Sequence, residues 1–239
     1  MKILLNAMNR TRSKWFATNL CRWLHPDDLE RYPLYPITDY FTEINGEMYL
    51  PYALAEDNLR ATKGSIVIDR DEEYAKRIRL ILAEKDCVIK IHPNESHELR
   101  AINQLQYNVD KVFKIVRRDR FNCCLSLHLA LYHQVWSNGP KMDQVLSGEP
   151  INLSPRVFNE LLHRYESQLD YLIRSPGTLI ICDHAEYIQD SRTFCNYFGL
   201  PVREFDLDNT HDVEFGNVKE KLVANYDILK SLDDNYKRA

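Results

Sequence analysis

Short apolar runs alternate along the chain with longer segments in which apolar residues recur at helical spacing. The short runs predict strands, because each is bounded by polar or turn residues. They are Lys2–Asn6, Ser65–Ile68, Val88–Ile91, Val112–Val116 and Thr178–Cys182. Within Tyr40–Leu50, the dipeptide Asn45-Gly46 separates two alternating segments and predicts a hairpin with a type I′ turn.

The longer segments predict amphipathic helices. One of them begins at Ser154-Pro155, a cap residue followed by a proline suited to the first helical position. Another ends at Gly199. The predicted helices are Ser13–Leu24, Asp71–Lys85, Asp119–Trp136, Ser154–Arg174, Ser191–Tyr197 and Val218–Leu232.

The order of these elements predicts the fold class. Strands that alternate with helices favour an α/β protein with three layers, in which helices cover both faces of a mostly parallel central sheet. We expect the 239 residues to form a single domain. In such sheets, ligands bind where strands end and helices begin, so those junctions are the places to search for a site.

Composition narrows the function classes. Hydrophobic residues make up 44% and charged residues 28%, as in ordinary globular proteins. The 31 Lys and Arg against 35 Asp and Glu give a net charge of −4, which argues against a general nucleic-acid binder. No apolar run approaches the ~20 residues of a membrane span, and no secretory signal is recognisable, so we expect a cytoplasmic protein without a membrane partner. Oligomeric state is not indicated.

Glycine and cysteine patterns exclude several familiar sites. None of the seven glycines forms a GxGxxG or GxxxxGK[ST] motif, so a standard dinucleotide fold or Walker-type ATPase is not expected. The six cysteines include no CxxC pair, so neither a zinc site nor a thioredoxin motif is predicted. We expect buried free thiols and no metal.

The first candidate junction follows the first predicted strand and opens the first helix. It reads Asn9-Arg10-Thr11-Arg12-Ser13-Lys14-Trp15 and combines three cations, two hydroxyls and the free amides of a helix start. These groups together favour a phosphate or sulfate. A solvated basic turn would have the same composition.

The second junction is Arg117-Arg118-Asp119-Arg120, which opens the most apolar helix, with Ser126 two turns further on. Arginine binds phosphate in a bidentate manner, although such a cluster can also be a surface ion-pair network. The third junction is Lys90-Ile91-His92-Pro93. A histidine at the carboxyl end of a strand can act as a general base or be purely structural.

Taken in order, these motifs resemble the sulfotransferase superfamily that uses 3′-phosphoadenosine 5′-phosphosulfate (PAPS), and in form they are most similar to bacterial carbohydrate sulfotransferases. RTRSKW resembles the 5′-phosphosulfate loop of that family, and RRDRFNCCLS resembles its 3′-phosphate motif, in which Arg118 and Ser126 keep the spacing of eight positions. KIHP is similar to the stretch that holds the catalytic histidine. TLIICDHAEYIQD and FCNYFGLP resemble a later strand, turn and short helix of the family.

The resemblance implies a P-loop-like sulfotransferase fold and transfer of a sulfuryl group to a hydroxyl or amine of a small-molecule or carbohydrate acceptor. It implies roles for the loop that follows the first strand. Arg10, with Lys14, would stabilise the leaving phosphate, and the 5′ end would lie against Thr11, Arg12, Ser13 and Lys14. Trp15 would stack on the adenine or pack in the core.

The other motifs have implied roles as well. Arg118 and Ser126 would hold the 3′-phosphate. His92 would remove the acceptor proton, with Asp39 or Glu43 as the alternative base. The acceptor would enter over residues of about 25–64 and 137–153. The resemblance implies no metal in the chemical step.

The chain departs from the family pattern at three places. The family's Tyr-Glu-Asp-Leu turn is degraded to Asp183-His184-Ala185-Glu186-Tyr187. Arg12 replaces the loop glycine, and no C-terminal RKG segment is recognisable. Lys219 and Lys221 are either substitutes for that segment or part of a solvated helix face. Two other function classes therefore stay open: a nucleotide or nucleoside kinase, and a non-catalytic anion-binding module on the same fold.

Overall fold

A computed structural model gives the arrangement of the chain. It describes residues 1–27, 34–36, 42–44, 47–49, 79, 82–83, 86–93, 102–133, 140–208 and 219–236. At 34–36, 42–44, 47–49, 140–142 and 184–186 only the backbone is described.

The centre of the fold is a five-stranded parallel sheet in the order β2-β5-β1-β6-β7. Its strands are β1 (Lys2–Ala7), β2 (Leu34–Pro36), β5 (Cys87–Ile91), β6 (Lys111–Val116) and β7 (Thr178–Ile181). In the register of β1, Asn6 lies opposite Ile91 of β5 and Lys114 of β6. Helices lie on both faces, so the predicted α/β fold with a parallel sheet is confirmed.

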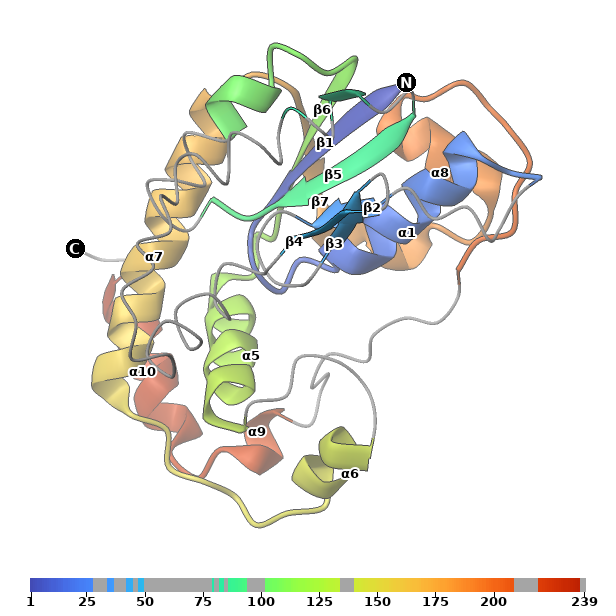
Figure 1. Ribbon diagram of the computed structural model, residues 1–239. Helices are drawn as coiled ribbons and strands as arrows, with labels where there is room; N and C mark the ends of the chain where they lie inside the picture. Colours follow the sequence, from blue (N-terminus) through green and yellow to red (C-terminus); the bar gives the residue numbers. More distant parts are fainter. Residues whose placement is uncertain are drawn as a thin grey trace, which may run out of the picture.

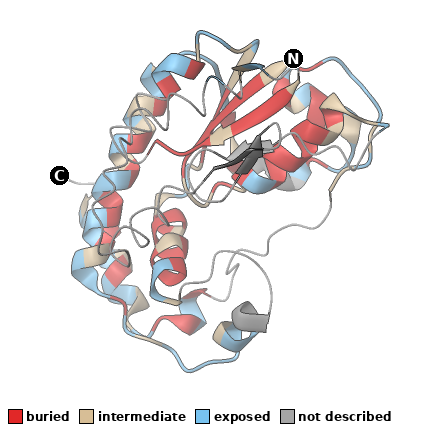
Figure 2. Cartoon of the chain, viewed as in Figure 1, coloured by how far each residue is buried: buried red, intermediate tan, exposed pale blue. Residues whose placement is uncertain are grey.

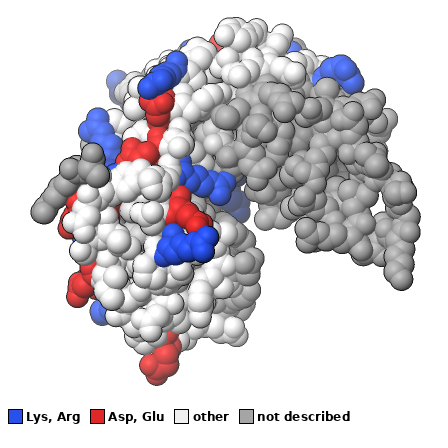
Figure 3. Space-filling view, turned by 90° about the vertical axis from the view of Figure 1, so that its left-hand side faces the viewer, with Lys and Arg blue, Asp and Glu red and all other residues white. Residues whose placement is uncertain are grey.

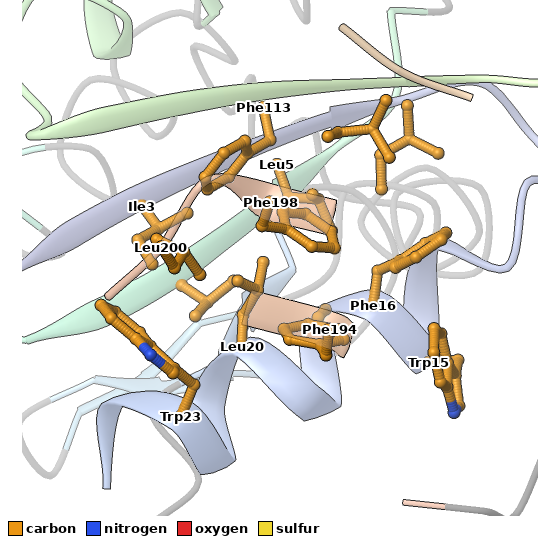
Figure 4. Packing of buried hydrophobic residues seen from close by; sticks show 14 of the residues in the cluster. Ile3, Leu5, Trp15, Phe16, Leu20, Trp23, Phe113, Phe194, Phe198 and Leu200 are labelled. Atoms are coloured by element: carbon orange, nitrogen blue, oxygen red, sulfur yellow. The ribbon is translucent and has the colours of Figure 1, made fainter. Parts of the chain in front are cut away.

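Helices α1 (Ser13–Leu24) and α8 (Ser191–Phe198) cover one face of the sheet (Figure 1). Alternate side chains of β1 point toward them, because successive residues of a strand face opposite sides. Figure 4 shows Ile3 and Leu5 packed with aromatic residues from both helices, including Phe16 and Phe198. The rings of Phe16 and Phe198 meet edge to face with centroids 5.5 Å apart.

The second apolar cluster joins helices from the later part of the chain. It is built on α5 (Arg120–His133), α7 (Pro155–Arg174), α9 (Lys219–Leu222) and α10 (Tyr226–Tyr236), with Met8 and Val116 from the ends of two strands. Figure 1 shows α7 on the opposite side of the sheet from α1 and α8, with α5 and α10 beside it. Figure 2 shows α5 buried along most of its length, whereas α7 presents a buried stripe and an exposed one.

Helix boundaries confirm several sequence predictions. The Ser154 hydroxyl accepts a hydrogen bond from the N–H of Val157 at 3.4 Å, and Pro155 begins α7. Gly199 ends α8 in the left-handed conformation, with φ at 59°. The predicted pair of hairpin strands is confirmed by β3 (Thr42–Ile44) and β4 (Glu47–Tyr49), which pair in antiparallel fashion. The type I′ turn predicted at Asn45-Gly46 lies outside the described residues.

Two predicted helices differ from the observed ones. The expected helix Val218–Leu232 is wrong, because the chain leaves α9 at Val223 to bridge Ile151 in parallel and then begins α10. The helix expected over Asp119–Trp136 is α5, which begins one residue later because Asp119 caps it. The strand Ser65–Ile68 lies outside the described residues, as does most of Asp71–Lys85.

The short helices complete the described fold. They are α6 (Pro140–Leu146), inside the segment 137–153, and the 3₁₀ helix η1 (Cys182–Tyr187) after β7. The six cysteines are free and buried, as predicted. Within the described ranges, no helix has both the length and the apolarity needed to cross a bilayer.

Charges of both signs are interspersed on the face that carries α7 (Figure 3). Two ion pairs along this helix are Arg156–Glu160 at 3.2 Å and Arg174–Asp170 at 2.8 Å. Exposed pairs of this kind contribute little to stability. Because positive and negative charges are interspersed there, the face that carries α7 does not produce an electrostatic potential of one sign.

Candidate functional site

The three basic or histidine-bearing junctions lie at one edge of the sheet. Their strands β5, β1 and β6 are consecutive neighbours and run in parallel, so their carboxyl ends meet. β7 is the next strand, and η1 follows it at the same edge. The topology therefore brings together motifs that are more than a hundred positions apart.

The loop between β1 and α1 has an unusual backbone. Arg10 and Arg12 have φ values of 59° and 55°, a region that side chains other than glycine rarely occupy. The hydroxyl of Thr11, which is fully buried, donates to the carbonyl of Met8 at 2.7 Å and fixes the turn between them. This loop keeps a conformation that glycine would adopt without strain.

The start of α1 is electrostatically suited to an anion. Arg12 is the N-cap residue, and its side chain makes no capping hydrogen bond. The first turn contains no acidic residue. The first amides of a helix have no partner within the helix and carry a partial positive charge, which favours a negative group there.

A direct contact joins this loop to α5. Arg10 donates from Nε to the hydroxyl of Ser126 at 3.0 Å. Arg117 Nη1 donates to the carbonyl of Arg10 at 3.3 Å, and Cys123 Sγ donates to the carbonyl of Asn9 at 3.2 Å. The two motifs that the sequence assigned to opposite ends of one nucleotide thus share a hydrogen-bonded boundary.

The turn between β6 and α5 carries three arginines whose side chains lie in different environments. The carboxylate of Asp183, in η1, accepts from the backbone N–H of Arg118 at 2.7 Å and lies 3.9 Å from Arg117 Nε. Tyr165 donates its hydroxyl to the carbonyl of Arg117. The side chain of Arg118 is exposed.

Arg120 belongs to a different environment. Its guanidinium binds Asp233 at 2.7 Å and Glu166 at 2.6 Å. Burial alone would lower the pKa of Arg120, but the hydrogen bonds and charges of the two carboxylates raise it. Arg118 is therefore the arginine of this turn whose side chain lies open to a ligand.

The first turn of α1 divides into inward and outward residues. Ser13 is buried and Lys14 is exposed. Trp15 is only 4% exposed and lies in the core, edge to face with Phe16 and Phe194 (Figure 4). Its indole N–H donates to the carbonyl of Asp208 at 2.5 Å. Of the two roles that fit Trp15 by sequence, the structure places it for core packing.

His92 follows β5 directly and is 8% exposed. Its Nδ1 lies 2.7 Å from the carbonyl oxygen of Ala7. A carbonyl can only accept, so Nδ1 carries the proton in the neutral ring and Nε2 keeps its lone pair. Burial, and secondarily the charge of Lys90, lowers the pKa of His92 to about 3, so the ring is neutral across the physiological range.

The remaining candidates have different placements. Asp39 lies outside the described residues, and Glu43 lies on β3, where only the backbone is described. Lys219 is not part of a solvated face: it is 4% exposed, and its ammonium donates to the carbonyl of Asn122 at 3.4 Å. Lys221 is exposed.

One polar residue at this edge was missed by the sequence reasoning. Asn6 is 1% exposed, and neither its side-chain oxygen nor its nitrogen has a hydrogen-bond partner among the residues that the structure describes. Leaving such groups unpaired in the interior is costly, which makes Asn6 a group that a ligand could satisfy. The signal was present, since Asn6 is a lone polar residue inside the apolar run ILLNA.

The comparisons with known proteins add no name. No protein-family model matches the chain, and no curated protein does either. The likeness to sulfotransferases therefore rests on the sequence motifs alone.

Proposed function

We propose that the chain is a PAPS-dependent sulfotransferase that transfers a sulfuryl group to a hydroxyl or amine of a small-molecule or carbohydrate acceptor. The observation that carries the proposal is the 3.0 Å hydrogen bond from Arg10 Nε to Ser126 Oγ. It joins the candidate 5′-phosphosulfate loop to the candidate 3′-phosphate helix at neighbouring strand ends. Two adjacent anion sites would suit a donor with a phosphate at each side of one ribose.

The charge and backbone of the edge support the proposal. Arg10, Arg12, Lys14 and Arg118 bring four cations to it, next to the uncapped start of α1. Arg12 stands where the family has glycine, yet it keeps a positive φ, so the departure in sequence does not change the backbone type. Arginine and amide donors of this kind bind phosphate and sulfate.

Under this proposal, the residues of the site have different roles in the reaction. Bound PAPS would supply the sulfuryl group and leave as 3′-phosphoadenosine 5′-phosphate (PAP). Arg10 and Lys14 would neutralise the charge that grows on the bridging oxygen as its bond to sulfur breaks. His92 Nε2 would accept the proton that the acceptor loses as its oxygen or nitrogen bonds to sulfur.

Calorimetric titration with PAP tests the proposal, with ADP and ATP as controls and EDTA present. We expect micromolar binding of PAP and much weaker binding of ADP, because only PAP presents a 3′-phosphate to Arg118 and Ser126. The variant Arg118→Ala should weaken PAP binding far more than ADP binding. Arg192→Ala, an exposed arginine on α8, is the matched control and should change neither.

Equal losses of PAP and ADP affinity in Arg118→Ala would contradict the assignment of the 3′-phosphate. Absence of PAP binding, or tighter binding of ATP in a parallel titration with Mg²⁺ in place of EDTA, would refute the proposal. The second outcome would favour a phosphotransferase.

A second candidate is a non-catalytic anion-binding module with the same site. The burial of His92 favours it, since a base must reach the acceptor. Binding of PAP without transfer from PAPS to any acceptor in a broad screen, together with unchanged PAP binding in His92→Ala, would select this alternative.

A further inference from the structure

The chain's last described segment, residues 219–236, makes a set of contacts that the proposed function does not explain. Those that fall on Arg120, Phe121 and Asn122 hold the first turn of α5. This turn begins two residues after Arg118. We call these contacts the C-terminal clamp.

The strongest part of the clamp is an ion pair. Arg120 donates to Asp233 twice, from Nε to Oδ1 at 2.7 Å and from Nη2 to the backbone carbonyl at 3.0 Å. Asp233 is fully buried, and the side chain of Arg120 is 11% exposed. Such a pair holds one geometry, because a guanidinium binds through a rigid fork.

Ring and amine contacts add to the ion pair. The guanidinium carbon of Arg120 lies 4.8 Å from the ring centre of Tyr236. The ammonium of Lys230 lies 4.4 Å from the ring centre of Phe121. Tyr226 meets the same phenyl ring edge to face at 5.2 Å.

α9 completes the clamp from the other side of the turn. The ammonium of Lys219 donates to the carbonyl of Asn122 at 3.4 Å. The backbone N–H of Asn122 is already held by the carboxylate of Asp119 at 3.1 Å. Arg120, the first residue of the turn, is therefore held by the C-terminal segment. Asn122, the last one, is held by that segment and by the cap residue Asp119.

We propose that the C-terminal clamp positions the first turn of α5 for anion binding, so that docking of α10 and binding of a 3′-phosphate stabilise one another. Arg120 is then a positioning residue that acts through Arg118 and Ser126 without touching the ligand. The identity of the anion rests on the proposed function. Coupling between two equilibria is reciprocal, so each event must favour the other by the same factor.

The variant Asp233→Asn tests the coupling. We expect its PAP affinity to fall by about tenfold, the usual size of such couplings, while its ADP affinity changes little. A merely structural defect would lower both affinities together or only the melting temperature. Asp227→Asn, an exposed carboxylate on the same helix, removes the same charge and should leave both affinities unchanged.

Lys230→Ala provides a milder variant in case Asp233→Asn does not fold. It should reduce the ratio of PAP to ADP affinity by a smaller factor. In the unmodified protein, hydrogen exchange supplies the reciprocal measurement: added PAP should slow amide exchange over residues 226–236.

The outcomes separate the clamp from the proposed function. If the unmodified protein binds PAP and folded Asp233→Asn binds it equally well, the clamp proposal is wrong and the proposed function stands. If the unmodified protein does not bind PAP, the proposed function fails. Faster exchange of the Asn122 and Cys123 amides in Asp233→Asn would then still support positioning of this turn, and unchanged exchange would refute it.

Discussion

The two basic strand-to-helix turns are similar in sequence but differ in how their helices begin. α1 starts at Arg12 in a left-handed conformation, without a side-chain cap. α5 starts after Asp119, whose carboxylate accepts from the N–H of Asn122 at 3.1 Å. The carboxylate of Asp119 thus holds one of the first amides of α5, whereas the N-cap residue of α1 makes no such side-chain bond.

The arginines differ in the same way. The guanidinium of Arg120 is paired with Asp233 and Glu166. That of Arg117 donates to the carbonyl of Arg10 and lies near Asp183. Arg118 alone of the three has an exposed side chain. A cluster of basic residues becomes an anion site only where its charges are not already used by the fold. We expect the anion to be bound by backbone amides of α1 and by side chains of α5.

We expect the largest effect on turnover from a substitution that breaks the contact between the two turns. Arg10→Ala removes the guanidinium that bonds Ser126, together with the charge proposed to face the leaving oxygen. Loss of one such transition-state donor typically slows turnover by about 10²–10³-fold. Steady-state rates of sulfuryl transfer measure the loss, and a variant with normal turnover would remove Arg10 from the leaving-group position.

His92→Ala tests the proposed general base at the third junction, which lies beside the other two junctions. We expect turnover to fall by about 10²-fold, the lower end for general bases, with PAP binding nearly intact. The low pKa of about 3 keeps His92 neutral, so kcat/KM for the proposed transfer by the unmodified protein should be level between pH 5 and 8. An acid limb near pH 6.5 that persists in His92→Ala would assign the base to another group.

The same low pKa predicts a pH dependence of stability. Between about pH 3 and 6.5 the unfolded chain binds a proton at His92 that the folded chain does not. The free energy of unfolding should therefore fall as pH is lowered through this window. Urea titrations at pH 7 and 5 should show a smaller loss for His92→Gln, and equal losses would contradict burial of the neutral ring.

The sequence predicted the sheet edge because strand ends are local signals. Apolar runs place Asn6, Ile91 and Val116 at the ends of predicted strands, and in the parallel sheet neighbouring strands bring their ends together. It also predicted the cap Ser154 and the stop at Gly199, which depend on single residue types in fixed positions.

What the sequence could not predict depends on contacts between distant segments. The role of Arg120 is set by Asp233, 113 positions later, and the helix expected over Val218–Leu232 is interrupted because Val223 pairs with Ile151. The unpartnered amide of Asn6 depends on what surrounds the strand. Local spacing carries no information on such partners.

Asp119→Ala removes the cap that distinguishes α5 from α1. Loss of an N-cap side chain costs about 1 kcal/mol, so the free energy of unfolding should fall by roughly that amount. Chemical denaturation measures it. Arg156→Ala, in the first turn of α7 with an exposed side chain, is the control and should change stability by less. An equal effect of the two substitutions would mean that Asp119 does not act as a cap.

Arg12→Gly gives the smallest expected effect and addresses the uncapped turn. Left-handed backbone costs a side-chain residue about 1–2 kcal/mol, and the extra freedom of glycine in the unfolded chain offsets about half of this. The variant should therefore unfold at slightly higher denaturant concentration, while the loss of one cation lowers PAP affinity several-fold. Stability that falls on this substitution would show that the Arg12 side chain makes contacts that outweigh the strain at φ 55°. Higher PAP affinity would instead show that this side chain obstructs the approach of the donor to the amides of α1, and the difference between the two turns would then be one of access.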